Sequence, residues 1–302
     1  MAERNFVGYG EHPPHAGWPA GARLAVSFVL NYEEGGEQSP LDGDPVTEPI
    51  MHEIVGAPAV EGRRILHIES MYEFGSRAGF WRIHRLFTRR GLPLTVFAVG
   101  QALERNPEAA RAMGAAGWEV VGHGWRWIDY GDVPEDVERD HIRRTNQVIA
   151  ELCGRRPAGW FTGRMSERTR TLAVAEGGLL YDSDSLADEL PYWVEVEGRA
   201  HLVVPYSLDC NDFKFLLNNG WVTGDDFYRY LLDTFDQLYD EGAETPKLMN
   251  VGLHCRIVGR PGRARALARF LDHISSVPGV WVATREEIAR HWAATHPPHI
   301  PA

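Results

Sequence analysis

Short apolar runs alternate with longer amphipathic stretches along the chain, and this alternation is the first clue to its fold. The run LTVFAV at residues 94–99 is almost entirely apolar and β-prone, which is typical of a parallel strand buried on both faces. Runs of similar character predict strands at residues 23–31, 94–99, 118–122, 158–161, 202–205, 248–254 and 280–283.

The stretches between these runs have the amphipathic character of helices. They predict helices at residues 77–90, 101–116, 134–152, 166–176, 224–241, 262–275 and 285–293. Glycine and proline mark several helix ends, as at Arg90-Gly91-Leu92-Pro93 and at Gly117. Strands that alternate with helices indicate βα units around a parallel sheet or barrel.

Two long irregular stretches interrupt this pattern. Residues 35–61 are polar and rich in Pro and Gly, and residues 182–199 contain DSDSLADELPYW. A loop as long as the first is usually a lid or an oligomer arm, and the second could play a similar part. The sequence has no internal repeat and no Ser/Gly linker, so it predicts one domain over residues 1–302, enlarged by loops.

Composition narrows the function classes. The 302 residues carry 31 Lys and Arg against 42 Asp and Glu, a net charge of −11, which argues against a nucleic-acid or anionic-membrane partner. The three cysteines (Cys153, Cys210 and Cys255) cannot form a closed disulfide set, which fits a reducing cytoplasm. No signal-peptide pattern opens the chain, and no apolar run approaches the ~20 residues of a membrane span, so we expect a soluble cytoplasmic protein.

Chemically useful side chains follow five of the predicted parallel strands. Since the carboxyl ends of such strands share one edge of the sheet, these side chains should lie close together. The candidates are Glu33 and Glu34; His123, Arg126, Trp127 and Asp129; Arg164; Asp182, Ser183 and Asp184; and His254, Cys255 and Arg256.

Each candidate also has a plain structural interpretation. Adjacent carboxylates are usually solvated, a single histidine after a strand is usually a hydrogen-bonded structural residue, and an aspartate often caps a turn. Trp127 and Trp160 could pack in the core, which is the default for Trp125, and Cys255 is most simply a small buried hydrophobe. The coincidence of five strand ends is what favours a functional site.

These residues leave two kinds of chemistry open. Glu34 and His123 could belong to a zinc site, but no HxxxH or HxH spacing exists, and Trp127, four residues after His123, cannot bind a metal. No cofactor is therefore firmly predicted, and a weakly bound divalent metal such as zinc stays open. Without a metal, Glu33 or Glu34 could activate water, while His254 acts as an acid and Arg164 stabilises negative charge.

The ordered motifs NYEEGGE, GHGWRWID, GWFTGR, YDSDS and GLHCRIVGRPGR resemble the polysaccharide deacetylase (NodB homology) superfamily, and most closely its branch of allantoinases and cyclic imide hydrolases. The likeness runs from about Gly8 to Trp292. It implies an α/β fold, a distorted (β/α) barrel of about seven parallel strands with long inserted loops. The site would lie at the carboxyl ends of the strands. It also implies a homo-oligomer, a dimer or tetramer, which the long 35–61 stretch favours as well.

The resemblance also implies roles for single residues. In the sugar deacetylases an Asp–Asp pair supplies a base and a metal ligand, two histidines four residues apart complete the metal site, and an arginine and a final histidine act on the substrate. The matching positions here are Glu33, Glu34, His123, Trp127, Arg164 and His254. One histidine ligand is thus a tryptophan, and both carboxylates are longer, as in the allantoinase-like branch.

These departures favour hydrolysis of a cyclic amide over deacetylation of a sugar. The preferred reaction is the opening of allantoin to allantoate in purine catabolism, with Arg164 and His123 holding the ring carbonyl. Trp127, Trp160 and Trp193 would pack on the planar ring, and Asp182 and Asp184 would orient the arginine or bind ring N–H groups. The alternatives are a cyclic imide hydrolase or hydantoinase, a metal-dependent N-acetyl sugar deacetylase, and a binding protein without catalysis.

Overall fold

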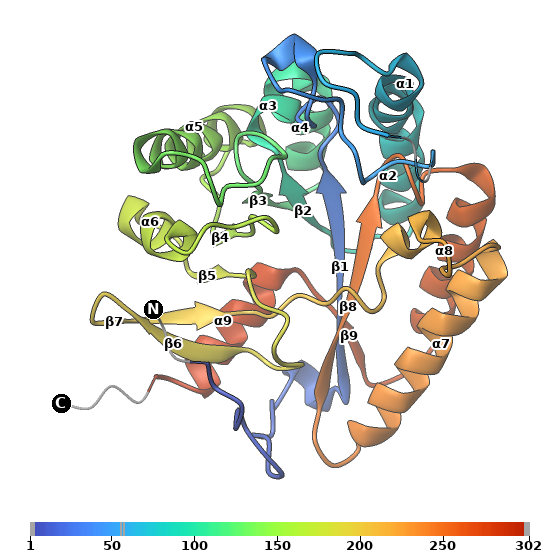
Figure 1. Ribbon diagram of the computed structural model, residues 1–302. Coiled ribbons are helices and arrows are strands. Elements are labelled where there is room, and N and C mark those ends of the chain that lie inside the picture. Colours follow the sequence, from blue (N-terminus) through green and yellow to red (C-terminus); the bar gives the residue numbers. More distant parts are fainter. Residues whose placement is uncertain (1–3, 55, 57, 299–302) are drawn as a thin grey trace.

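A curled, mostly parallel sheet forms the centre of the protein, as the computed structural model shows for residues 4–54, 56 and 58–298 (Figure 1). Its strands are β1 (Leu24–Tyr32), β2 (Thr95–Ala98), β3 (Glu119–Gly122), β4 (Gly159–Trp160), β5 (Tyr181–Asp182), β6 (Tyr192–Val196), β7 (Arg199–Val203), β8 (Lys247–His254) and β9 (Val280–Val282). Their order is β6-β7-β5-β4-β3-β2-β1-β8, with β9 paired to β1, and only the β6–β7 hairpin is antiparallel. Within the described residues no pairing joins β6 to β8, so the sheet is a half-barrel rather than a closed one.

Helices surround the outer face of this sheet (Figure 1). They are α1 (Leu66–Phe74), α2 (Phe80–Thr88), α3 (Gly100–Arg105), α4 (Pro107–Ala115), α5 (Glu135–Cys153), α6 (Thr169–Glu176), α7 (Gly224–Glu241), α8 (Pro261–Ile274) and α9 (Arg285–Thr295). Capping boxes start α7 at Thr223 and α9 at Thr284, where each threonine accepts a backbone N–H from the first helical turn. Across the part of the chain described, no helix is both long and apolar enough to cross a bilayer.

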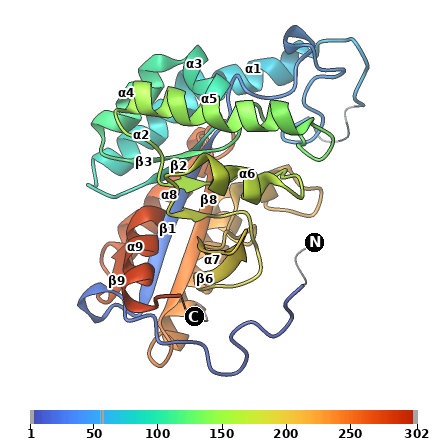
Figure 2. The same ribbon diagram turned by 90° about the vertical axis from the view of Figure 1, so that its left-hand side faces the viewer.

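The two long strands β1 and β8 run side by side through the molecule (Figure 1 and Figure 2). All nine residues of β1 are buried, because its outer face packs under the helices and its inner face fills the half-barrel. The register pairs Asn31 of β1 with His254 of β8. On the other side Tyr32 pairs with Ala98 of β2, which pairs with Gly122 just before His123. This register brings three strand ends to one edge.

The structure confirms the distorted-barrel fold and corrects several details of the elements. The predicted helix at 101–116 is broken into α3 and α4 at Asn106, because the following Pro107 disfavours a helical conformation there. The predicted helix at 77–90 continues a helix that begins at Leu66, through a π-turn at Gly75–Gly79. The stretch at 182–199 is not one long loop, since β6 and the turn into β7 occupy its second half.

Residues 35–54, here named the cover segment, lie over the carboxyl edge of the sheet. Arginines of the barrel hold its carboxylates: Arg105 binds Asp42, Arg126 binds Asp44, Arg164 binds Glu48, and Arg260 and Arg263 bind Glu53. The backbone joins it too, since the Trp127 amide donates to the Gly36 carbonyl at 2.7 Å. The cover segment is therefore attached to the site from several sides.

Candidate active site

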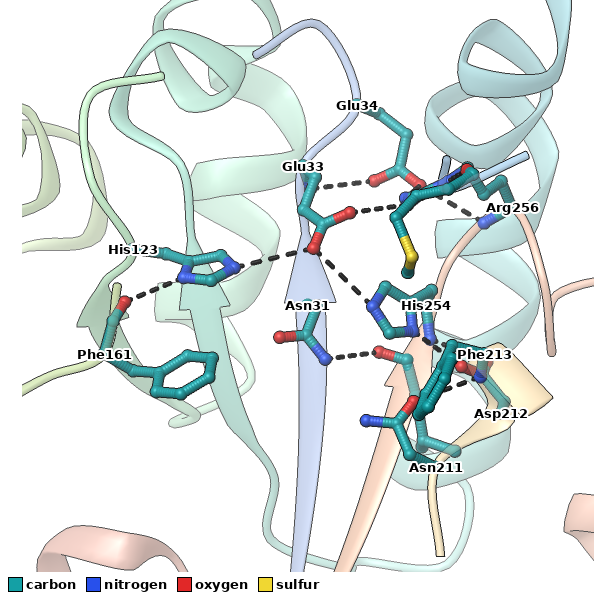
Figure 3. Close-up of polar contacts among 12 residues, drawn as sticks. Asn31, Glu33, Glu34, His123, Phe161, Asn211, Asp212, Phe213, His254 and Arg256 are labelled. Carbon is teal, nitrogen blue, oxygen red and sulfur yellow. Dashed lines mark hydrogen bonds and ion pairs between the residues drawn. The ribbon is translucent and has the colours of Figure 1, made fainter. Parts of the chain in front are cut away.

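Glu33 lies at the centre of the site, directly after β1, and its side chain is fully buried. One carboxylate oxygen, Oε2, is 2.6 Å from Nη2 of Arg256. The other, Oε1, lies between two imidazoles, 3.5 Å from Nε2 of His123 and 3.6 Å from Nε2 of His254 (Figure 3). Oε1 is buried and forms no hydrogen bond within 3.5 Å that satisfies the geometry among the described residues, so the two imidazole nitrogens are its nearest polar neighbours.

His123 is held in one orientation by the strand next to it. Its Nδ1 lies 2.7 Å from the carbonyl oxygen of Phe161, and because a carbonyl only accepts, Nδ1 carries the proton. The ring also stacks on the Phe161 ring, with centroids 5.2 Å apart. Nε2 therefore faces Glu33 with its lone pair when the ring is neutral, and it has no hydrogen-bond partner in the described part of the chain.

His254 forms a buried pair with Asp212, the first residue of the 3-10 helix Asp212–Leu216. Nδ1 of His254 donates to Oδ1 of Asp212 at 2.6 Å, while Oδ2 accepts the backbone N–H groups of His254 and Val258 at 2.7 and 3.0 Å. Burial lowers the pKa of His254, but Asp212 and then Glu33 outweigh it and raise this pKa to about 9. His254 is therefore an imidazolium at neutral pH, with Nε2–H directed toward Glu33.

The two neighbouring carboxylates differ in surroundings. Arg256 and then His254 overcome the effect of burial on Glu33 and hold its pKa well below the usual range. Glu34 turns away: Oε1 accepts from the Arg256 backbone N–H at 3.2 Å, Oε2 accepts from the Glu33 N–H at 3.1 Å, and burial raises its pKa despite Arg256. Its carboxylate also packs on Gly75, where an added Cβ would lie 2.4 Å from Oε1. Glu33 is thus the carboxylate that faces the two histidines, and its lowered pKa favours the ionised form.

A pocket of about 860 Å³ opens in front of Glu33, a volume suited to a small-molecule ligand. Arg164 lines it from the loop after β4, with Nη2 3.0 Å from Glu48 and its guanidinium 4.4 Å from the centre of the Trp127 ring. The remaining walls come from neighbouring strand ends, the cover segment and the chain after β7. They include Asn31, Ile50, Met51, Trp127, Phe161, Asp184, Tyr206, Asn211, Phe213 and His254.

Comparisons with known proteins give the family of this chain. The sequence profile described as Polysaccharide deacetylase matches residues 66–178. A Schizosaccharomyces pombe protein that its name assigns to the polysaccharide deacetylases is 46% identical over 299 residues, covering 93% of each chain. The chain belongs to the polysaccharide deacetylase family.

Two solved structures of high similarity cover almost the whole chain. A Pseudomonas aeruginosa PAO1 protein, described as a polysaccharide deacetylase, is 51% identical with a TM-score of 0.96 over 99% of this chain and 100% of its own. The PuuE allantoinase is also 51% identical, with a TM-score of 0.95 over 99% of both chains. The half-barrel is thus the fold of a family of hydrolases.

The donor set that the resemblance assigns to a metal in this family does not fit a metal here. Trp127 offers no ligating atom, and both oxygens of Glu34 accept hydrogen bonds from the backbone, away from His123. The His254 imidazolium and the Arg256 guanidinium place two positive charges beside the same space. No group of three or more His, Cys, Asp and Glu side chains in the described ranges is arranged to hold an ion. We therefore derive no step through a metal.

Three residues that the sequence predicts to contact the substrate bind other parts of the protein in the structure. Asp182 binds Arg170 and His201 at 2.7 and 3.0 Å, the Trp160 indole donates to Thr162 at 2.8 Å, and the Trp193 indole donates to the His296 carbonyl at 2.6 Å. The pocket wall contains none of the three, so we assign them to the support of the barrel.

Asp184, by contrast, does line the pocket, but as a support for the loop that carries Arg164. It accepts the N–H groups of Thr162 and Gly163 at 2.9 Å. Burial, and then Asp182, raise the pKa of Asp184 to about 7. Its contact with the backbone orients the arginine loop without touching the guanidinium.

Sequence reasoning missed several residues of the site. Three of them, Tyr206, Asn211 and Asp212, lie in the irregular chain between β7 and α7, and Glu48 lies in the cover segment. These segments have no helical or strand periodicity from which the position of a side chain could be predicted. Arg256 was a candidate without a role, although its position two residues after His254 put it at the right strand end. The remaining strand-end candidates have local roles: Asp129 caps a turn at Gly131, and Trp125 and Cys255 pack in the core.

Proposed function

We propose that this protein hydrolyses a small cyclic amide, with allantoin as the substrate and allantoate as the product. The observation that carries the proposal is the pairing of an ionised carboxylate, Glu33, with a protonated acid, His254, 3.6 Å apart at one pocket. A general base that takes a proton from water and a general acid that protonates the leaving nitrogen both speed amide hydrolysis. The high identity to the PuuE allantoinase over nearly the whole chain supports allantoin as the ring.

The chemistry balances with these two groups. A water molecule at Oε1 of Glu33 gives one proton to that carboxylate while its oxygen bonds to the ring carbonyl carbon. Arg164, on the pocket wall, stabilises the negative charge that develops on the carbonyl oxygen. The carbon–nitrogen bond then breaks as Nε2 of His254 gives its proton to the leaving nitrogen.

The groups then return to their starting states. Glu33 holds the proton that His254 lacks, and the Oε1–Nε2 separation of 3.6 Å allows the proton to pass between them. The new carboxylic acid loses its own proton to solvent, so one water is consumed and the ring is opened. Trp127 stands where the deacetylases have a histidine ligand and offers a flat face for the ring, and His123 Nε2 supplies an acceptor for the attacking water.

The direct test is the conversion of allantoin to allantoate by the purified protein. Replacing the base, Glu33→Gln, should lower kcat by about 10²–10⁴-fold, which is the usual contribution of a general base. The matched control is Glu53→Gln, since Glu53 lies in the cover segment outside the pocket and binds Arg260 and Arg263.

Other substrates decide between the alternatives. Turnover of succinimide or hydantoin without allantoin would move the assignment to another small ring. Zinc-dependent release of acetate from N-acetylglucosamine oligomers, with no ring opened, would overturn the proposal in favour of deacetylation. Binding of a ring without hydrolysis, and equally by Glu33→Gln, would indicate a binding protein.

A further inference from the structure

Asn31 is a buried polar residue on the floor of the pocket that the reaction above does not use. It is 2% exposed and lines the pocket. It lies near the end of β1, two positions before Glu33, which directly follows the strand, and both side chains line the pocket. Its amide and the catalytic carboxylate therefore face the same space, one layer apart (Figure 3).

The hydrogen bonds of Asn31 decide which end of its amide faces the pocket. Nδ2 lies 3.1 Å from the carbonyl oxygen of Leu253 and 3.3 Å from Oη of Tyr206. A backbone carbonyl only accepts, so the NH₂ group must face Leu253 and the amide oxygen must face the other way. Oδ1 is then an acceptor on the pocket side, and no hydrogen bond among the described residues ends on it.

Neighbouring residues hold this arrangement in place. Tyr206 Oη also accepts Nδ2 of Asn211 at 3.0 Å, and Oδ1 of Asn211 accepts the backbone N–H of Phe213 at 3.1 Å. The cluster fits only because residue 252 is glycine, since a Cβ there would lie 2.3 Å from both Asn211 and Tyr206. The acceptor is thus fixed on a buried, packed support.

We propose that Asn31 is a specificity-determining residue that accepts the N–H of the leaving ring nitrogen, the nitrogen that receives the proton of His254 as the ring opens. The inference rests on the proposed function and narrows its substrate class to cyclic ureides and imides with an unsubstituted nitrogen at this place. A ring edge of this kind offers an N–H beside a C=O, which matches an acceptor on the floor and the Arg164 donor on the wall. An N-alkyl ring would leave Oδ1 buried without a partner, and an unpaired buried acceptor weakens binding.

The test compares rings that differ only at this nitrogen. The probes are allantoin against 3-methylallantoin, and succinimide against N-methylsuccinimide, each measured as kcat/KM. The wild-type protein should prefer the N–H ring by about 100-fold or more, as expected for a site with a hydrogen-bonding group left unpaired. In Asn31→Leu, which keeps bulk and removes the acceptor, this preference should fall below about tenfold. Asn31→Ala, which also makes room, should lose the preference as well.

The outcomes separate this inference from the proposed function. A wild-type protein that opens neither N–H ring refutes the proposed function, whereas one that opens the N–H and N-methyl rings equally refutes only the role of Asn31. Equal losses on both rings, with the ratio kept in Asn31→Leu, would also overturn it, because a purely structural role lowers both rates alike. Asn146→Ala serves as the control, since Asn146 is equally buried on α5 outside the pocket. If the Asn31 variants do not fold, Tyr206→Phe is the substitute test. It removes the hydroxyl group that contacts the Asn31 amide but keeps Asn31, so we expect a smaller loss of the preference for the N–H ring.

Discussion

The Asp212→Asn variant should lose most of its activity at pH 8 and keep most of it at pH 6. Asp212 is the first cause of the high pKa of His254, which rises from the usual 6.5 to about 9. Asn cannot replace both contacts: if its oxygen keeps the backbone N–H groups of His254 and Val258, its NH₂ group faces Nδ1 of His254. The imidazolium then loses its neutralising charge and its acceptor together.

The size of the effect follows from the two protonation states. A rise of the His254 pKa from 6.5 to about 9 corresponds to about 3 kcal/mol in favour of the imidazolium. If the variant returns to the usual pKa, about 3% of its molecules hold the acid proton at pH 8, against about 90% in the wild type. The expected loss is therefore about 30-fold at pH 8 and less than about twofold at pH 6.

The assay is kcat/KM for ring opening between pH 5 and 10, with Asp209→Asn as the control, since Asp209 is an exposed carboxylate three residues earlier. The midpoint of the alkaline limb of the pH profile should lie near pH 9 in the wild type and the control, and near pH 6.5 in Asp212→Asn. The free energy of unfolding should also fall as the pH rises. Because the folded pKa of His254 is raised, its contribution is complete below pH 6.5 and is lost as the pH rises through about 9. A loss of activity that is equal at every pH would refute the role of Asp212 as the group that keeps His254 protonated.

Three further predictions come from the same geometry. Glu48→Gln should lower kcat/KM by about 10–100-fold, because Glu48 holds Arg164 at 3.0 Å, whereas Glu53→Gln should stay near wild type; similar values for both variants would contradict this. Gly75→Ala should lower the free energy of unfolding by about 1–3 kcal/mol in urea titrations, since the new methyl group meets the buried Glu34 carboxylate, and an unchanged midpoint would contradict the packing described. Dialysis against a chelator should leave kcat unchanged, and a loss that zinc restores would show that the donor set has been misjudged.

The parts of the fold that the sequence predicts are those with strong local patterns. β1 and β8 are long, mostly apolar segments that are buried over nearly their whole length, so composition and length identify them. β5 has two residues, Tyr181 and Asp182, and its pairing with β4 and β7 depends on distant chain that no local window contains. The break between α3 and α4 was visible in principle, because an Asn–Pro pair at 106–107 marks a helix start.

The same distinction between local pattern and distant contact applies to the residues of the site. Glu33, His123 and His254 could be predicted to meet because parallel strands end at one edge of a sheet. The choice between Glu33 and Glu34 could not, since it depends on which carboxylate turns toward Gly75 and the Arg256 backbone. The partner of His254 was equally out of reach, because Asp212 reaches the edge through irregular chain before α7.

Arg256 gives the site a fixed positive charge beside its two adjacent carboxylates. Its guanidinium lies 2.6 Å from Oε2 of Glu33 and 3.4 Å from Oε1 of Glu34, so it contacts both carboxylates of the EE pair. Its Nε also donates to the Met51 carbonyl at 3.0 Å, which ties the same side chain to the cover segment. A fixed cation on Oε2 favours the ionised form of Glu33, while Oε1 faces the two histidines. Trp127 replaces one of the two histidines that the resemblance assigns to a metal, and in this chain Arg256 supplies a fixed positive charge that contacts both Glu33 and Glu34.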